Sequence, residues 1–405
     1  MDLEPEIFLH LLMQKALAAV KPKELVLAYL DDLQARTYTV VGCGKAAAQM
    51  ALGVEQVLGA KASGLVVVPY GYEAPCRHIQ VIAAAHPVPD QNAITATNQI
   101  CQLVKTTTNP VLALISGGGS SVLCAPAPFI TLAQKQAIIT ELLAKGTPIA
   151  KLNLVRGALS QVKSGGLGRM SARQPTKVLV LSDVPTNAPN LVASGPFSPS
   201  CPDGQACLDV LEQASIKISA KIRNGILSLE QANKTGPPAT NTQLIGAGFT
   251  ALQAAENWAK AKGLQVHNLG DGLEASAKQL AQIHLQYIQQ NKAKTPFLLL
   301  SGGEANVEVT GKGQGGPNRH FLLHLANLLP DGLQMAALAI DTDGRDGPDG
   351  EAGAWFTSQM LQGRTDINQW LNQCDSGNFF KALDSSIHTG PTGTNVNDFR
   401  AILVW

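Results

Sequence analysis

The chain lacks the features that mark several classes of protein. Its seven cysteines are scattered and odd in number, and no CxxC pair occurs, so neither a disulfide framework nor a zinc site is indicated. Charged residues make up only 15% of the chain and the formal net charge is +1. Without a basic stripe interleaved with aromatic residues, the sequence argues against binding to nucleic acid or to an anionic membrane. Small molecules are therefore the expected partners.

Apolar runs are short throughout, and none reaches the length of a membrane span. The first twenty residues, MDLEPEIFLHLLMQKALAAV, carry acidic residues before the apolar stretch, which is the reverse of a secretory leader. We therefore expect a cytoplasmic protein. The oligomeric state stays open, with a homodimer among the alternatives.

Short runs rich in Val, Ile and Leu alternate with amphipathic segments along the whole chain. The runs predict strands at 37–42, 65–69, 80–85, 111–116, 177–182, 244–247, 297–301 and 336–341. The amphipathic segments predict helices at 45–58, 92–104, 132–143 and 251–262. Unbroken apolar strands between helices are typical of parallel sheets covered on both faces. The predicted fold is α/β, with two three-layer α/β/α domains and mostly parallel sheets, the first of them Rossmann-like.

A chain of 405 residues exceeds what one hydrophobic core usually serves, so we expect two domains. The polar stretch 230–242 (EQANKTGPPATNT) lacks periodicity and contains a Pro-Pro pair, which indicates a linker. We predict an N-terminal domain at 1–235 and a smaller C-terminal domain at 236–405.

A glycine-rich turn follows the predicted strand 111–116. It reads Ser116, Gly117, Gly118, Gly119, Ser120, Ser121. Missing side chains let backbone N–H groups approach an anion closely, and the hydroxyl groups add donors. The turn is not a Walker A loop, because no Gly-Lys-Ser/Thr sequence follows. We predict that it binds phosphate.

A second glycine turn, at 42–45, ends in Gly44 and Lys45 at the start of an alanine-rich helix. A cation at a helix N-terminus is unfavourable unless an anion lies beside it, which indicates a phosphate partner for Lys45. The same turn fits Gly-x-Gly-x-x-Ala, as does the segment 246–251. A dinucleotide site would also need an acid at the end of the next strand, and the predicted strand 65–69 ends in Pro69, Tyr70, Gly71 and Tyr72, without one.

Other predicted strand exits carry polar side chains. Asp183 follows the strand 177–182 and is a candidate to orient a metal or to accept a hydroxyl proton. Gly302, Gly303 and Glu304 follow the strand 297–301. The acidic run 341–351 does not take the EF-hand order, so we expect it to bind Mg²⁺ with a nucleotide.

Two cations, Arg156 and Lys163, are seven residues apart, which places them near one face of a predicted helix. Together they suit a substrate carboxylate or a transferred phosphoryl group.

Taken in order, the motifs resemble those of the type II glycerate 2-kinases, whose C-terminal half is called the MOFRL domain. The resemblance rests on GCGKAA (42–47), HPVPD (86–90), ISGGGS (115–120), SDVP (182–185), SGP (194–196), SGGE (301–304), TDG (342–344) and TGPTGTNVND (389–398). It implies ATP- and Mg²⁺-dependent phosphorylation of D-glycerate to 2-phosphoglycerate in a cleft between two domains.

The resemblance also implies residue roles. Lys45 and Asp183 match family positions in the first glycine turn and in the Ser-Asp-Val-Pro turn. We predict nucleotide binding by the 116–120 turn, a Mg²⁺ contact through Asp343 or Asp346, and closure of the cleft by Thr392 to Asn397, with Asn395 near the nucleotide.

One position departs from the family pattern Gly-Gly-Arg-Asn, because Pro317 stands where the family has arginine. Arg319 or Lys312 is a candidate to supply the missing charge. Two other functions stay open. One is an NAD(P)-dependent hydroxypyruvate reductase, a name that this family has also carried, and the other is a non-catalytic nucleotide sensor.

Overall fold

The computed structural model describes residues 4–232, 240–308 and 311–405. These residues form two compact units, which we describe separately. The parallel-sheet unit comprises Pro22–Ser182 and Ala188–Ile245. The mixed-sheet unit comprises the described residues up to Lys21 together with Asp183–Asn187 and Gly246–Trp405.

The parallel-sheet unit is built on a six-stranded sheet with the strand order β3-β2-β1-β4-β5-β6. Its strands are β1 (Tyr38–Cys43), β2 (Ala62–Pro69), β3 (Ile79–Ala84), β4 (Val111–Ser116), β5 (Thr176–Leu181) and β6 (Asn241–Gly246). The pairs among β1 to β5 are all parallel. Every residue of β1 and β4 is buried, as expected for central strands with both faces covered.

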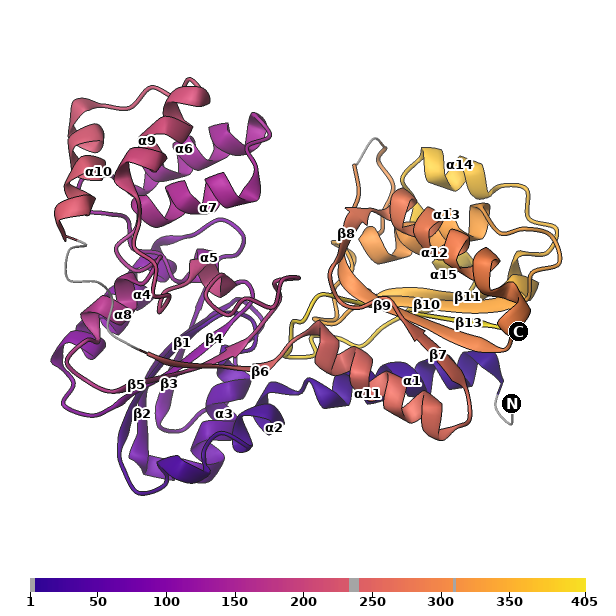
Figure 1. The fold of residues 1–405 in the computed structure, drawn as a ribbon, viewed down its shortest axis with the longest axis horizontal. Coiled ribbons are helices and arrows are strands. Elements are labelled where there is room, and N and C mark those ends of the chain that lie inside the picture. The colour runs from indigo at the N-terminus through magenta and orange to yellow at the C-terminus, as the bar shows by residue number, and fades with distance from the viewer. Residues whose placement is uncertain (1–3, 233–239, 309–310) are drawn as a thin grey trace. The chain divides into compact units, whose positions relative to one another are not determined.

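Helices cover both faces of this sheet (Figure 1). On one face lie α2 (Pro22–Leu27) and α3 (Ala47–Leu58), and on the other lie α4 (Gln91–Thr106), α5 (Gly119–Val122) and α8 (Gly166–Met170). Four further helices, α6 (Leu132–Ala144), α7 (Ile149–Ala158), α9 (Gly204–Gln213) and α10 (Ala220–Ala232), enclose a small core of their own that includes Leu142, Val155 and Leu211. Short 3₁₀ turns occur at Asp31–Leu33, Gly59–Lys61 and Val192–Ser194.

The mixed-sheet unit contains a seven-stranded sheet. Six of its strands follow the order β12-β11-β10-β13-β9-β7, and the seventh, β8, pairs with β9. The strands are β7 (Gln265–Asn268), β8 (Leu273–Ser276), β9 (Phe297–Asn306), β10 (Met335–Asp341), β11 (Gly353–Thr357), β12 (Ser386–Ile387) and β13 (Asp398–Val404). Among the strands that the structure describes in this sheet, β7 and β8 alone pair parallel, both with β9. The pairs that link β9, β13, β10, β11 and β12 are antiparallel.

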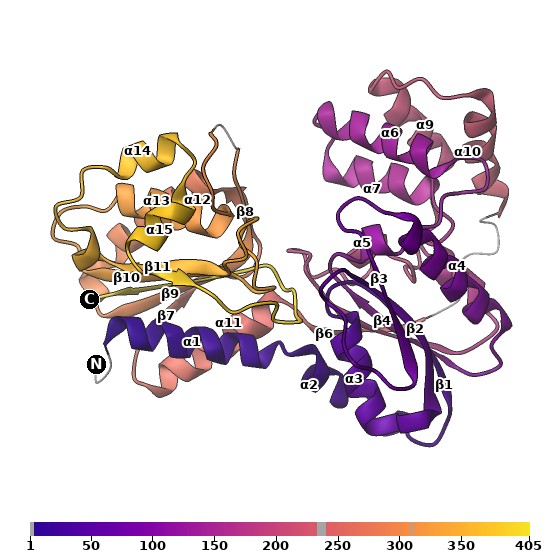
Figure 2. The same cartoon turned by 180° about the vertical axis from the view of Figure 1, so that it is seen from behind.

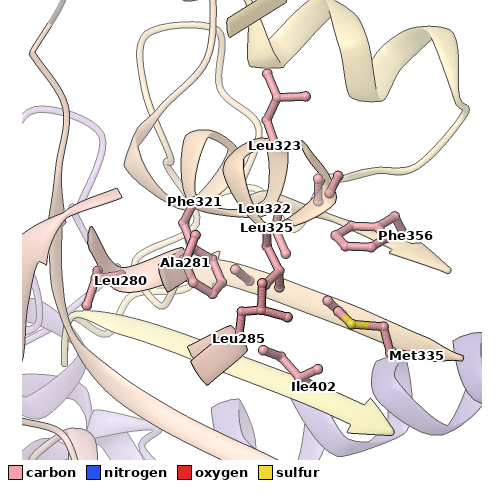
Figure 3. Packing of buried hydrophobic residues seen from close by; sticks show 14 of the residues in the cluster. Leu280, Ala281, Leu285, Phe321, Leu322, Leu323, Leu325, Met335, Phe356 and Ile402 are labelled. Atoms are coloured by element: carbon pink, nitrogen blue, oxygen red, sulfur yellow. The ribbon is translucent and has the colours of Figure 1, made fainter. Parts of the chain in front are cut away.

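Two long helices cover each face of this second sheet (Figure 2). On one face are α1 (Pro5–Ala19) and α11 (Gly248–Ala261), which pack together with the Phe8 and Trp258 rings 5.1 Å apart. On the other are α12 (Ala277–Asn291) and α13 (Pro317–Asn327), accompanied by α14 (Ile367–Asn372) and α15 (Ser376–Ala382). The 3₁₀ turns are Lys292–Lys294 and Ser358–Leu361. Side chains of α12 and α13, among them Leu285 and Phe321, meet Met335 and Ile402 of the sheet in a continuous core (Figure 3).

The predicted fold class is confirmed, since both units are three-layer α/β structures and all eight predicted strands and four predicted helices occur. The expectation of a mostly parallel second sheet is wrong. The reason is β13, an apolar strand that was not predicted, which lies between β9 and β10 and runs antiparallel to both.

The structure also differs from the predicted domain division. Residues 4–21 belong to the mixed-sheet unit, because α1 buries an apolar face that includes Phe8, Leu12 and Ala16 against that unit. The predicted boundary between 235 and 236, with most of the predicted linker, lies outside the described residues. At its edges, residues 230–232 end α10 and residues 241–242 begin β6. Among the described helices, none combines the length and apolar character needed to cross a membrane.

Candidate active site

A cavity of about 460 Å³ opens at the carboxyl ends of β3 and β4 in the parallel-sheet unit. Its walls come from the segment 86–89 after β3, the turn 118–121 after β4, and the helices α6 and α7. Three basic side chains line it, Lys135, Arg156 and Lys163, and its lining residues include no Asp or Glu. The position matches the edge of an α/β sheet at which ligands usually bind, and the charge favours an anion.

The two glycine turns that the sequence singled out are packed against each other beside this cavity. The backbone N–H of Lys45 donates to the Gly117 carbonyl oxygen at 2.8 Å, and that of Ala46 donates to Ser116 Oγ at 3.0 Å. Gly44 has a φ of +111°, and a Cβ there would lie 2.3 Å from the Ser116 carbonyl oxygen. Glycine at 44 therefore permits this close approach.

Lys45 and His86 both lie close to Gly118, the left-handed residue that precedes α5. A Cβ at Gly118 would lie 3.2 Å from Lys45 Cγ and 3.6 Å from His86 Cε1. The Lys45 ammonium is 5.9 Å from the centroid of the Tyr72 ring, and His86 Nδ1 is 2.7 Å from Ser121 Oγ. The glycine turn thus holds a cation and an imidazole close to the point at which β4 ends.

Lys163 is almost fully buried behind the same turn. Its ammonium donates to the carbonyl oxygen and to Oγ of Ser120, at 2.6 and 2.5 Å, and lies 3.5 Å from Ser194 Oγ. Burial, reinforced by repulsion from Lys135 and Arg156, lowers the pKa of Lys163 to about 7. A bound anion would favour the charged form of this lysine.

Arg156 and Lys163 do not share a helix, contrary to the sequence prediction. The helix α7 ends at Ala158, and Lys163 lies in the irregular segment that follows. The cavity nevertheless brings both side chains together. Arg156 also donates from Nη1 to Asn153 Oδ1 at 3.2 Å, and burial lowers its pKa.

Sequence reasoning missed Lys135, the third cation. In α6 the buried residues are Lys135, Ile138 and Leu142, which share one face of the helix. The sequence feature that could have indicated it is a lysine on the otherwise apolar face of the predicted helix 132–143.

Asp183 belongs to the mixed-sheet unit, whereas Lys45 belongs to the parallel-sheet unit. Asn395 Nδ2 lies 3.4 Å from Asp183 Oδ2, and Asn397 Nδ2 donates to the Asp183 carbonyl oxygen. The neighbouring Thr392 donates from its backbone N–H to the Asp343 carbonyl oxygen at 3.2 Å. The predicted residues Asp183, Asp343, Thr392 and Asn395 therefore gather at the segment 389–398.

Asp346 and Arg319 form a buried ion pair, with Arg319 Nε 3.1 Å from Asp346 Oδ2. The backbone N–H groups of Asn318 and Arg319 also donate to the Asp346 carboxylate. Two further hydrogen bonds tie the Arg319 guanidinium to Asp349. These contacts bury the Arg319 side chain fully and support a structural role for it. That Arg319 or Lys312 supplies the charge of the missing family arginine stays a prediction.

Hydrogen bonds occupy the Asp346 oxygens in the same way, and Asp343 Oδ1 accepts from the Arg345 N–H at 2.8 Å. A metal contact through Asp343 or Asp346 stays a prediction. Within residues 4–232, 240–308 and 311–405, no three His, Cys, Asp or Glu side chains form a metal-binding group.

Gly302, Gly303 and Glu304 do not form a strand-exit turn as predicted. They lie inside β9, where Gly302 and Gly303 pair with Phe399 and Asp398 of β13. Gly303 has a φ of +100°, and a Cβ there would lie 2.2 Å from the Leu273 carbonyl oxygen. The glycines permit close approach of β8 to β9, and Glu304 is exposed beside them.

Two family models match the chain. Residues 8–227 match a domain of unknown function, DUF4147, and residues 297–398 match the MOFRL family. A protein of Agrobacterium vitis named hydroxypyruvate reductase is 35% identical, over 100% of this chain and 95% of its own. D-glycerate 2-kinase of Thermotoga maritima is 34% identical, over 96% of this chain and 95% of its own. A crystal structure of glycerate kinase from Thermotoga maritima superposes with a TM-score of 0.89 at 32% identity, covering 98% of this chain and 99% of that one.

Proposed function

The chain belongs to the type II glycerate 2-kinase family, and we propose that it transfers the γ-phosphoryl group of ATP to D-glycerate, forming 2-phospho-D-glycerate. The observation that carries the proposal is the cavity beside the two glycine turns, lined by three basic and no acidic side chains. Both substrates and both products of this reaction are anions. A water-poor site with fixed cations is what phosphoryl transfer requires, because catalysis consists mainly of positioning and charge neutralisation.

Residues of the parallel-sheet unit supply the positive charge in this proposal. The turn 116–121 would bind the nucleotide phosphates, and Lys45, held against Gly118, would stabilise charge on the transferred group. Lys163 fixes the turn through Ser120 and adds charge behind it. Arg156 faces the same cavity and would bind the acceptor or the phosphoryl group.

We also propose roles for residues of the mixed-sheet unit. Asp183 would accept the proton of the acceptor hydroxyl as the new P–O bond forms. Mg²⁺, when bound, would neutralise phosphate charge, and Asp343 is the residue that we propose to contact it, directly or through water. Thr392 and Asn395, together with Gly302, Gly303 and Glu304, are proposed nucleotide contacts from this unit.

The name of the Agrobacterium vitis relative makes an NAD(P)-dependent hydroxypyruvate reductase the second candidate. Local geometry weighs against it. In a dinucleotide site the backbone N–H groups of the first glycine turn face the pyrophosphate. Here the N–H groups of Lys45 and Ala46 are bonded to the 116–117 turn. Two acids follow β2 before the next helix. Glu73 accepts from the Gly71 N–H at 2.8 Å, and Asp90 has its oxygens occupied by the Ala93 N–H and the Tyr70 hydroxyl.

The test is to incubate the protein with Mg·ATP and D-glycerate, follow ADP release, and identify the phosphoglycerate isomer by NMR. A parallel reaction with NADH and hydroxypyruvate tests the reductase. We expect 2-phosphoglycerate and no oxidation of NADH. NADH oxidation without ADP release would refute the kinase, and ATP binding without turnover would indicate a nucleotide sensor. A cytoplasmic location, where ATP is available, and a homodimeric state stay predictions.

A further inference from the structure

Lys135 is the least expected residue of the cavity wall. It lies in the middle of α6, its side chain is only 6% exposed, and Ile138 and Leu142 share its buried face. Within the part of the chain that the structure describes, no atom accepts a hydrogen bond from its ammonium. Burying an unpaired ammonium is strongly unfavourable, whereas leucine or methionine at this position would stabilise the fold. Such a residue is best explained by a ligand that pairs with it.

The surroundings of Lys135 define the charge of that ligand. Arg156 and Lys163 line the same cavity and repel the Lys135 ammonium, and no carboxylate lines the cavity to offset the three charges. The two lysines differ in one respect. Lys163 is bonded to Ser120 of the glycine turn, while Lys135 lies on α6 among apolar wall residues such as Leu132 and Ile139. The α6 wall therefore presents a cation that is separate from the phosphate-binding turn.

We propose that Lys135, together with Arg156, binds the carboxylate of the hydroxy acid and makes the site specific for an acidic acceptor. This inference rests on the proposed kinase function, which it deepens by naming the groups that distinguish an acid from an uncharged alcohol. An ammonium and a guanidinium can both donate to the two oxygens of one carboxylate. The apolar wall lowers the local dielectric, so an uncharged polyol would leave both cations without a negatively charged partner.

The experiment compares the wild type with Lys135→Met, with Lys151→Met as the control. Lys151 lies on the neighbouring helix α7 and is exposed, with its ammonium 2.9 Å from Gln213 Oε1. In K135M we expect the KM for D-glycerate to rise by about tenfold to a hundredfold, the range for one charged hydrogen bond. The KM for ATP should not change, and the preference for D-glycerate over glycerol should fall. Lys135→Arg should restore part of the affinity.

The temperature of thermal unfolding distinguishes a ligand-binding role of Lys135 from a purely structural one. Without ligand, K135M should unfold at a higher temperature than the wild type, because it no longer buries an unpaired charge. At one fixed concentration of D-glycerate, the unfolding temperature should rise for the wild type and for K151M by more than it rises for K135M. A lysine that merely held the fold together would give the opposite change in the unliganded protein.

Three results would overturn the inference. An unchanged KM for D-glycerate in K135M is the first. The second is a K135M variant that binds D-glycerate normally but has a raised KM for ATP or binds inorganic phosphate more weakly. Lys135 would then bind phosphate. The third is a wild type that does not bind D-glycerate in calorimetry. Calorimetry needs no turnover, so loss of D-glycerate binding in K135M would support the inference even if the kinase proposal failed.

Discussion

Substitution of Arg319 tests whether this residue has a structural or a catalytic role. Its guanidinium is fully buried at the start of α13 and is hydrogen-bonded to Asp346 and to both oxygens of Asp349. Arg319→Met keeps most of the side-chain volume but leaves the buried Asp346 carboxylate without its cation. Removing one partner of a buried ion pair costs about 3–5 kcal/mol. For a unit of roughly 190 residues this corresponds to a decrease of about 6–20 °C in Tm.

The same variant has an expected pH dependence. Burial raises the pKa of Asp346 to about 6 even with Arg319 beside it, and removal of Arg319 raises it further. A folded-state pKa above the unfolded value means that the folded chain takes up the proton first, so the loss of stability in R319M should shrink as the pH falls from 8 to 5.

Calorimetry measures the Tm, and the kinase assay at 20 °C measures kcat on the folded variant, which should stay within about twofold of the wild type. Lys312→Met, which changes the exposed second candidate for the missing charge, is the control and should leave the Tm unchanged. A normal Tm with a large loss of kcat in R319M would refute the structural role and return Arg319 to the active site.

Three further predictions concern the cavity. Gly118→Ala places a methyl group at a φ of +74° and 3.2 Å from Lys45 Cγ, so it should displace Lys45 and lower kcat by about tenfold or more, while circular dichroism stays unchanged. Lys45→Met should lower kcat by about 10²–10³ without changing the Tm by more than a few degrees, and near-normal turnover would contradict its proposed role. Burial lowers the pKa of Lys163 in the folded chain to about 7, below its ordinary value. Between pH 7 and about 10, Lys163 is therefore protonated in the unfolded chain but neutral in the folded chain. The free energy of unfolding should therefore rise with pH across this window by about 1.4 kcal/mol per pH unit, and Lys163→Met should remove this rise. If urea unfolding gave the same dependence of stability on pH for the wild type and for K163M, the lowered pKa of Lys163 would be refuted.

Local pattern was enough to predict most of the fold. The runs at 37–42 and 111–116 are apolar on both faces, and they became the buried central strands β1 and β4 with their glycine turns at the predicted edge of the sheet. Family membership followed from the order of the turn motifs and is borne out by the relatives. These features depend on residues that are close in sequence.

Long-range pairing explains what the sequence did not show. The direction of β13 depends on β9 and β10, which precede it by many residues, so the antiparallel sheet could not be inferred from a local apolar run. The glycines at 302 and 303 resemble a turn, but they accommodate the close approach of β8 within a continuous strand. Lys135 escaped notice because a lysine in a helix is usually exposed, and only the packing of α6 buries it.

The placement of α1 has a consequence for biosynthesis. The helix α1 packs on α11, which begins about 230 residues later in the chain. At synthesis rates of about 5–20 residues per second, the apolar face of α1 has no native partner for about 10–50 s. The parallel-sheet unit can be completed during this interval, since most of its residues precede α11. Folding in the order of synthesis therefore leaves α1 to dock only after residues from more than halfway along the chain have emerged.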